Sequence, residues 1–114
     1  MIFSLELVGN KIGNWLFTSG QGPLDPETKK IPDEFSDQVK ATLENIKGII
    51  EAAGGTMGHI VKTTVFLKDM KNFEKMNRIY KKYFPEKPPA RSCVEVARLP
   101  LDIQVEIEAT VYIP

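Results

Sequence analysis

The chain contains 114 residues, of which 42% are hydrophobic and 26% charged, as expected for one soluble globular domain spanning residues 1–114. Its 15 basic and 15 acidic residues cancel, and this balance argues against an extended nucleic-acid-binding surface. A single cysteine excludes an internal disulfide and suits a reducing cytoplasm, and with only one histidine it argues against a zinc site. Neither a signal peptide nor an apolar run of membrane-spanning length is evident, so we expect a cytoplasmic protein with no membrane partner.

The N-terminal part predicts two strands joined by a tight turn. The first predicted strand is Ile2–Val8, the turn is Gly9–Lys11, and the second strand is Trp15–Thr18. The segment Ser19–Pro23 follows, and its two glycines would let the backbone bend sharply and approach a ligand closely. Turns of this kind more often simply end a strand, so this segment alone defines no site.

The middle of the chain begins with a predicted helix over Glu34–Ala53. Asp33 is a favourable N-cap for this helix, and Gly54–Gly55 supplies the conformational freedom that ends it. One apolar stripe at helical spacing marks the side that faces the core: Phe35, Val39, Leu43, Ile46, Ile50 and Ala53. A strand over Ile60–Lys68 follows, and its expected core-facing residues are Val61, Val65 and Leu67.

A second helix is predicted from a cap at Asp69 or Asn72 to about Phe84. Its apolar stripe consists of Phe73, Met76, Tyr80 and Phe84. Asn77 lies at the edge of this stripe, and a partly buried amide needs hydrogen-bond partners. It could tie a loop to the helix, the more common case, or it could contact a ligand.

The last two predicted strands carry an arginine and a glutamate. Alternation from Ile103 to Ile113 places one apolar set on the core side and Glu106 on the opposite face. In the preceding strand we expect Val94 and Val96 on the core side, which directs Arg91, Cys93 and Glu95 to the side of Glu106. Antiparallel pairing across a Leu99–Asp102 turn would bring Cys93 within reach of Glu106, with Arg91 one step beyond. The arginine and glutamate would then form either a structural salt bridge or a ligand site.

This β-β-α-β-α-β-β order predicts an α+β fold: a two-layer sandwich of a mixed sheet with two helices on one face. The other face of the sheet would mix apolar and charged side chains: Ile60, Lys62, Thr64, Phe66, Cys93, Glu95, Glu106, Glu108 and Tyr112. A sheet face of this kind is often a subunit interface, so we expect self-association.

Several ordered motifs resemble the RidA/YjgF family of imine and enamine deaminases. They are Thr18-Ser19-Gly20-Gln21, Asn45 with Glu51–Gly54, Val61–Phe66, Asn77, Tyr80 and Phe84, and above all Pro89–Pro100 with Val105–Ala109. The resemblance implies a chorismate-mutase-like fold and a homotrimer with clefts between subunits, in which no cofactor is used. It also implies that Arg91 binds the carboxylate of a 2-imino or 2-enamino acid such as 2-aminoacrylate and that Glu106 holds the attacking water. Ser19, Gly20, Asn77 and Cys93 would line or support the cleft.

The N-terminus departs from the family pattern, which usually ends an early segment in Gly-Pro-Tyr-Ser. The aromatic match here would be Phe3 if the first hairpin is longer by about three residues, whereas an ungapped register places Glu6 there. The tyrosine hydroxyl is missing in either register. Two other functions stay open: a non-catalytic module that binds a small carboxylate, and the ribonuclease or translation-inhibitor activity known for family relatives, against which the balanced charge argues.

Overall fold

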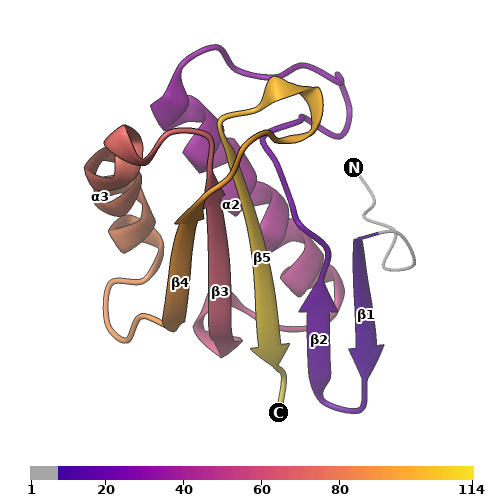
Figure 1. Ribbon diagram of the computed structural model, residues 1–114. Coiled ribbons are helices and arrows are strands. Elements are labelled where there is room, and N and C mark those ends of the chain that lie inside the picture. Colours follow the sequence, from indigo (N-terminus) through magenta and orange to yellow (C-terminus); the bar gives the residue numbers. More distant parts are fainter. Residues whose placement is uncertain (1–7) are drawn as a thin grey trace.

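The computed structural model describes residues 8–114, so the predicted strand at Ile2–Val8 falls almost wholly outside it, together with Phe3 and Glu6. Within the described part, five strands form one mixed sheet in the order β1-β2-β5-β3-β4 (Figure 1). The strands are β1 (Gly9–Ile12), β2 (Trp15–Thr18), β3 (Ile60–Leu67), β4 (Ala90–Glu95) and β5 (Val105–Tyr112). The helices are α2 (Phe35–Ala52) and α3 (Phe73–Tyr83).

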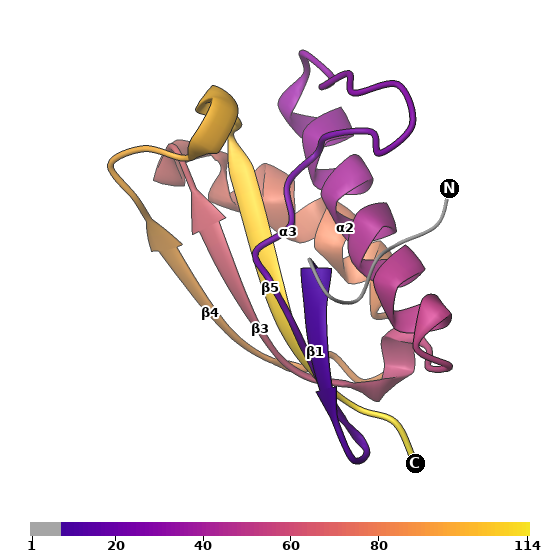
Figure 2. The same cartoon turned by 90° about the vertical axis from the view of Figure 1, so that its right-hand side faces the viewer.

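Helices α2 and α3 cover one face of the sheet, and Figure 2 shows the two layers edge-on. The core lies between them, and the alternating residues of β5 from Val105 to Val111 are at most 4% exposed. From the helices it includes most of the two predicted stripes: Phe35, Val39, Leu43, Ile46, Ile50, Met76, Tyr80 and Phe84. The predicted element order and the two-layer α+β architecture are therefore confirmed.

The first hairpin turns later than predicted. Gly9 pairs with Thr18 and Ile12 pairs with Trp15, so the segment predicted as a turn belongs to β1. Gly13 instead begins a two-residue turn with a φ of +58°, a left-handed conformation that glycine adopts without steric cost. Gly9-Asn10 and Gly13-Asn14 are both turn-like dipeptides, and only the pairing of β1 with β2 distinguishes them.

Strand β4 does not pair with β5, so the predicted C-terminal hairpin is wrong. β4 runs parallel to β3, while β5 lies antiparallel between β2 and β3. The elements β3, α3 and β4 form a strand–helix–strand unit, in which a crossover helix makes the two strands parallel neighbours. The chain then crosses the end of β3, where Val96 N–H donates to Leu67 O and Lys68 N–H donates to Gln104 O.

The register of β4 also reverses its predicted faces. Thr63 lies opposite Arg91 and Val65 lies opposite Cys93, so these two β4 residues point to the helix side of the sheet. Glu95, opposite buried Leu67, shares that side, and Val94 is 42% exposed on the other face. Because β4 is an edge strand beside α3, its one valine, Val94, does not need to face the core.

Two smaller predictions also differ from the structure. A register shift between Ile60 and Lys62 buries Ile60 and leaves Val61 45% exposed, which reverses their expected places. Helix α2 is capped by Glu34 without a side-chain hydrogen bond, and Asp33 lies outside the helix. Its predicted end is confirmed, because Gly54 follows the last turn at a φ of +91°.

Candidate active site

Arg91 is immobilised on the helix side of the sheet by residues of α3. Its Nη1 donates a 2.6 Å hydrogen bond to Asn77 Oδ1. Its guanidinium carbon lies 4.9 Å from the centre of the Tyr80 ring and 5.5 Å from that of Phe73. Phe73, Asn77 and Tyr80 are spaced four and three residues apart, so one face of the helix presents all three to the arginine. The amide of Asn77 thus connects α3 to a strand.

Tyr80 is itself held by a buried hydrogen bond. Its hydroxyl lies 2.7 Å from Thr63 Oγ1, and both residues are at most 4% exposed. Burial raises the pKa of the Tyr80 hydroxyl, so the group is neutral and can share a proton with the threonine. A tyrosine fixed at both its ring and its hydroxyl gives the guanidinium a rigid surface on which to lie.

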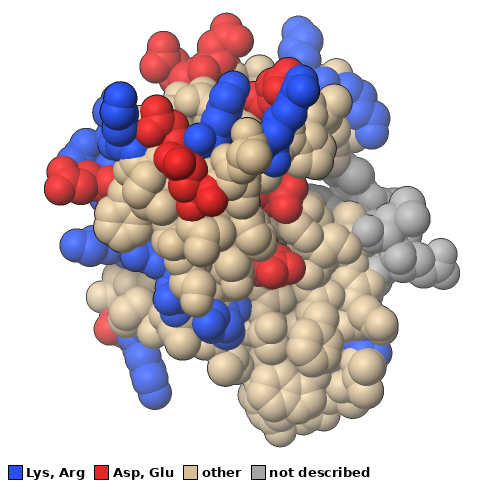
Figure 3. All heavy atoms as spheres, in the orientation of Figure 1, with Lys and Arg blue, Asp and Glu red and all other residues tan. Residues whose placement is uncertain are grey.

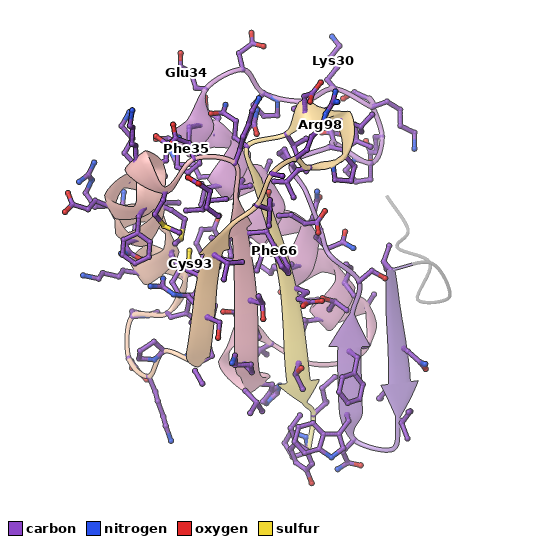
Figure 4. The ribbon with its side chains drawn as sticks, viewed as in Figure 1. Lys30, Glu34, Phe35, Phe66, Cys93 and Arg98 are labelled. Atoms are coloured by element: carbon purple, nitrogen blue, oxygen red, sulfur yellow. The ribbon has the colours of Figure 1, made fainter. Side chains whose placement is uncertain are left out.

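Cys93 follows Arg91 on the same side of β4. Figure 4 shows it between β4 and α3, whereas Phe66 stands over the open face. It borders a cavity of about 550 Å³ with Met70, Lys71, Phe73 and Glu74. Burial raises the pKa of the thiol despite the opposing charge of Arg91. A protonated thiol is a poor nucleophile, and this agrees with an assignment of Cys93 to the wall of a pocket.

The segment after β2 contains a bulge. Phe17 pairs with Thr110, and Gln21 pairs with Ile107 through hydrogen bonds of 2.8 and 2.9 Å in both directions. Between these two pairs, three residues of β2 and the segment after it oppose two residues of β5. The ladder of hydrogen bonds therefore opens at Ser19 and Gly20. The Thr18 hydroxyl fills the gap, because its oxygen accepts a 2.9 Å hydrogen bond from Ala109 N–H.

Glu106 lies next to this bulge on the open face of the sheet. A Cβ atom at Gly20 would collide with the Glu106 carboxylate, so only glycine leaves the carboxylate in this position. Partial burial raises the pKa of Glu106, and the like charge of Glu108 raises it further. The carboxylate is thus more basic than an ordinary glutamate.

A cavity of about 330 Å³ opens beside Glu106 and Gly20. Its wall includes the segment after the bulge, part of α2 and the turn between β4 and β5. Asn45 of α2 fixes this wall, since its Nδ2 donates 2.9 Å hydrogen bonds to the carbonyls of both Gly22 and Leu24. Lys29 also lines the cavity. Its ammonium group is therefore an alternative to the Arg91 guanidinium as the cation that binds a ligand carboxylate.

The predicted site residues therefore form two groups. Arg91, Asn77 and Cys93 gather on the helix side, whereas Gly20 and Glu106 meet at the open face, with Ser19 in the adjoining bulge. The strand β3 separates the two groups, so the predicted proximity of Cys93 to Glu106 within one chain is wrong. Phe3 lies outside the described residues.

The supporting roles of three residues were not predicted: Thr18 in the bulge, Asn45 under the loop and Thr63 behind Tyr80. Asn45 and Thr63 carried a signal, because a polar side chain within a helix or strand that packs on the core needs a partner. Thr18 carried none, since an extra residue in a strand is recognised only from its pairing.

Over residues 8–114, no group of three or more His, Cys, Asp or Glu side chains is arranged to hold a metal ion. In the same residues, no helix is long and apolar enough to cross a membrane.

The open face, which faces the viewer in Figure 3, carries charges of both signs in its upper part and a broad uncharged area below. Among the aromatic residues of β2 and β5, Trp15, Phe17 and Tyr112 are exposed, and the rings of Trp15 and Tyr112 lie 4.9 Å apart.

The architecture is that of a small α+β domain with one covered and one open sheet face. Residues 7–113 match the family model for Endoribonuclease L-PSP, and the chain belongs to this family, which includes the RidA/YjgF proteins.

Several curated relatives carry deaminase names. The chain is 50% identical over 104 residues to the 2-iminobutanoate/2-iminopropanoate deaminase of Escherichia coli, covering 89% of this chain and 81% of the relative. A RutC family protein of Pyrococcus horikoshii is 52% identical over 103 residues, covering 90% and 82%. The crystal structure of E. coli TdcF with bound serine matches with a TM-score of 0.90 at 45% identity, covering 93% of this chain and 86% of that one.

Proposed function

We propose that this protein is a cytoplasmic enzyme that hydrolyses 2-imino and 2-enamino acids to 2-oxo acids and ammonia. Arg91 binds the substrate carboxylate, and Glu106 positions water and accepts its proton as the oxygen attacks the imine carbon. Glu106 then returns this proton to the nitrogen of the carbinolamine. As the C–N bond breaks, the carbinolamine hydroxyl gives its own proton to Glu106, so that the C=O bond of the 2-oxo acid forms and ammonia leaves. A 2-enamino acid enters the same path after it takes up a proton on C3, which converts it to the imine. A protonated imine is already electrophilic, so orientation and one proton acceptor are sufficient and no cofactor is required. The deaminase names of relatives at about 50% identity support this reaction.

The observation that carries the proposal is that the Arg91 guanidinium is held in place but has no carboxylate partner among residues 8–114. Asn77 and the two rings of α3 fix its orientation, yet among residues 8–114 no carboxylate lies within salt-bridge distance of it. A partly buried arginine with donors remaining is suited to grip a carboxylate in a bidentate pair. The structural alternative, a salt bridge to Glu106 within one chain, is not formed because the two residues lie on opposite faces of the sheet.

The same separation supports a site shared between two copies of the chain. Arg91 lies on an edge strand, and Glu106 lies on the open face with its exposed aromatic residues. We propose that the chains assemble as a homotrimer in which the Arg91 group of one subunit meets the Glu106 group of the next. The serine bound in TdcF supports a cleft that accepts a small amino-acid-like carboxylate.

The first test is turnover of an imino acid formed in situ by an amino-acid oxidase, with semicarbazide trapping the remainder. We expect Arg91→Ala to lower turnover by at least about a hundredfold while the oligomer stays intact. Lys29→Ala is the matched control, because Lys29 lies in the Glu106 cavity of the same chain. If Lys29→Ala abolishes turnover and Arg91→Ala does not, the carboxylate is bound within one chain and the proposal is wrong.

Mixing two inactive variants tests the shared site. Arg91→Ala and Glu106→Gln subunits are denatured and refolded together, so that a cleft can combine Arg91 of one chain with Glu106 of the other. Random assembly gives about a quarter of the clefts both native residues, and turnover should recover to about that fraction. No recovery in verified mixed oligomers would show that both residues act within one chain.

A non-catalytic carboxylate-binding module is the second candidate, favoured by the bound serine in TdcF. Calorimetric binding of a small carboxylate without acceleration of any imine would select it. RNA cleavage agrees less well with the balanced charge and the mixed signs in Figure 3. Ribonuclease activity that survives both repurification and Arg91→Ala would support it.

A further inference from the structure

The turn between β4 and β5 holds a leucine out into solvent at the edge of the Glu106 cavity. Leu101 is 71% exposed and lines this cavity. Its φ is +59°, and Asp102 follows at +53°, so two successive non-glycine residues adopt the left-handed conformation. Such backbone persists only where the surroundings enforce it, and an exposed leucine does not gain from it by burial.

The surrounding residues do enforce this conformation. Leu99 and Ile103 flank the turn and are buried, which anchors it on both sides. The Arg98 guanidinium donates to both carboxylate oxygens of Asp102 at 3.0 and 3.4 Å. Ile103 also packs where a side chain at Gly22 would lie, so the turn fits closely against the segment that follows the bulge. The backbone at Leu101 is therefore held on both sides of the turn.

The cavity is larger than a three-carbon imino acid needs. Its volume of about 330 Å³ equals that of about eleven water molecules, whereas such an acid has about six non-hydrogen atoms. Apolar side chains of Leu24, Pro100, Leu101 and Ile103 line it, together with the polar residues Gln21, Lys29, Asn45 and Glu106. A substrate whose imine carbon is held at Glu106 would place its side chain among these apolar residues.

We propose that Leu101, with Pro100 and Ile103, forms a subsite for an aliphatic substrate side chain. The preferred substrates are then imino acids with side chains of the size of leucine or methionine, rather than three-carbon imino acids. This inference rests on the proposed function. Each methylene placed in such a pocket raises kcat/KM by about fourfold or more.

The test compares imino acids formed from alanine, 2-aminobutanoate, methionine and leucine. The native protein should show a kcat/KM that rises along this series. Leu101→Asn keeps the left-handed backbone, which asparagine tolerates, and removes the apolar surface. It should lower kcat/KM for the leucine-derived imine about tenfold more than for the alanine-derived one. Leu101→Met is the matched variant that keeps an aliphatic side chain, and it should retain the native preference.

The outcomes separate this inference from the proposed function. Acceleration of the alanine-derived imine with no dependence on side-chain length would overturn the subsite and leave the deaminase intact. An equal loss for all imines in Leu101→Asn, together with a change of oligomeric state by light scattering, would overturn it too, because Leu101 would then be a subunit contact. No acceleration of any imine by the native protein would remove both proposals.

Discussion

The two charged residues of the proposed site lie in contrasting environments. Arg91, on the helix side, is held by an amide and two aromatic rings of its own chain. Glu106, on the open side, lies beside a glycine bulge, and its pKa is raised by partial burial and by the like charge of a second carboxylate. Arg91 is thus held in a fixed orientation, whereas Glu106 is a stronger base than an ordinary glutamate. Because neither neutralises the other within a chain, both remain available to a ligand.

The largest loss of turnover should come from a substitution that displaces Glu106. In Gly20→Ala the new methyl group would occupy the place of the Glu106 carboxylate, so the carboxylate must move. A displacement of about 1 Å is enough to lower turnover by about a hundredfold. Because a flexible side chain yields, the midpoint of urea unfolding should change little.

Gly58→Ala is the matched control, since the nearest heavy atom to its new Cβ would be 3.6 Å away. Both variants gain the same methyl group, and only Gly20→Ala should affect turnover. Equal activity of the two variants would show that the position of Glu106 does not matter.

On the arginine side, Tyr80→Phe should give an intermediate effect. It keeps the ring beneath Arg91 but leaves the buried Thr63 hydroxyl without its partner, which costs about 1–3 kcal/mol of unfolding free energy. The loosened ring should raise KM for the imino acid about two- to fivefold with less change in kcat. Urea unfolding and steady-state kinetics measure the two effects.

Tyr83→Phe provides the control on the same helix. Tyr83 donates a 2.8 Å hydrogen bond to Glu44 at the surface, and its pKa is raised to about 12, chiefly by partial burial. Its loss should cost no more than about 1 kcal/mol and leave KM unchanged. A KM change of equal size in both variants would mean that Tyr80 acts only through general stability.

The smallest expected effect is a shift in pH dependence. Glu106 must be ionised to accept a proton, so turnover should fall as pH drops through its raised pKa. Glu108→Gln removes the like charge that contributes to this rise, so the pKa of Glu106 should fall and the acid limb should move to lower pH. An acid limb that stays in place in Glu108→Gln would show that another group controls it.

The alternation of apolar residues determined much of the fold. The clean pattern of β5 fixed the face of Glu106. The apolar stripe of α3 placed Asn77 at the margin of the core. The motifs that resemble the family also predicted the residues that make up both groups of the proposed site. Each of these signals is local, because it depends only on spacing along one strand or one helix.

Tertiary structure alone decided how the groups are arranged. The face of Arg91 depends on the register of β4 against β3, and a parallel edge strand beside a helix has no need to direct its valine inward. The bulge at Ser19 and Gly20 likewise exists only through the pairing of Gln21 with Ile107 of β5. The sequence by itself determined which residues face the core on most elements, and it predicted which residues make up the proposed site. Pairing between strands, which no local spacing encodes, decided that Arg91 and Glu106 lie on opposite faces of one sheet.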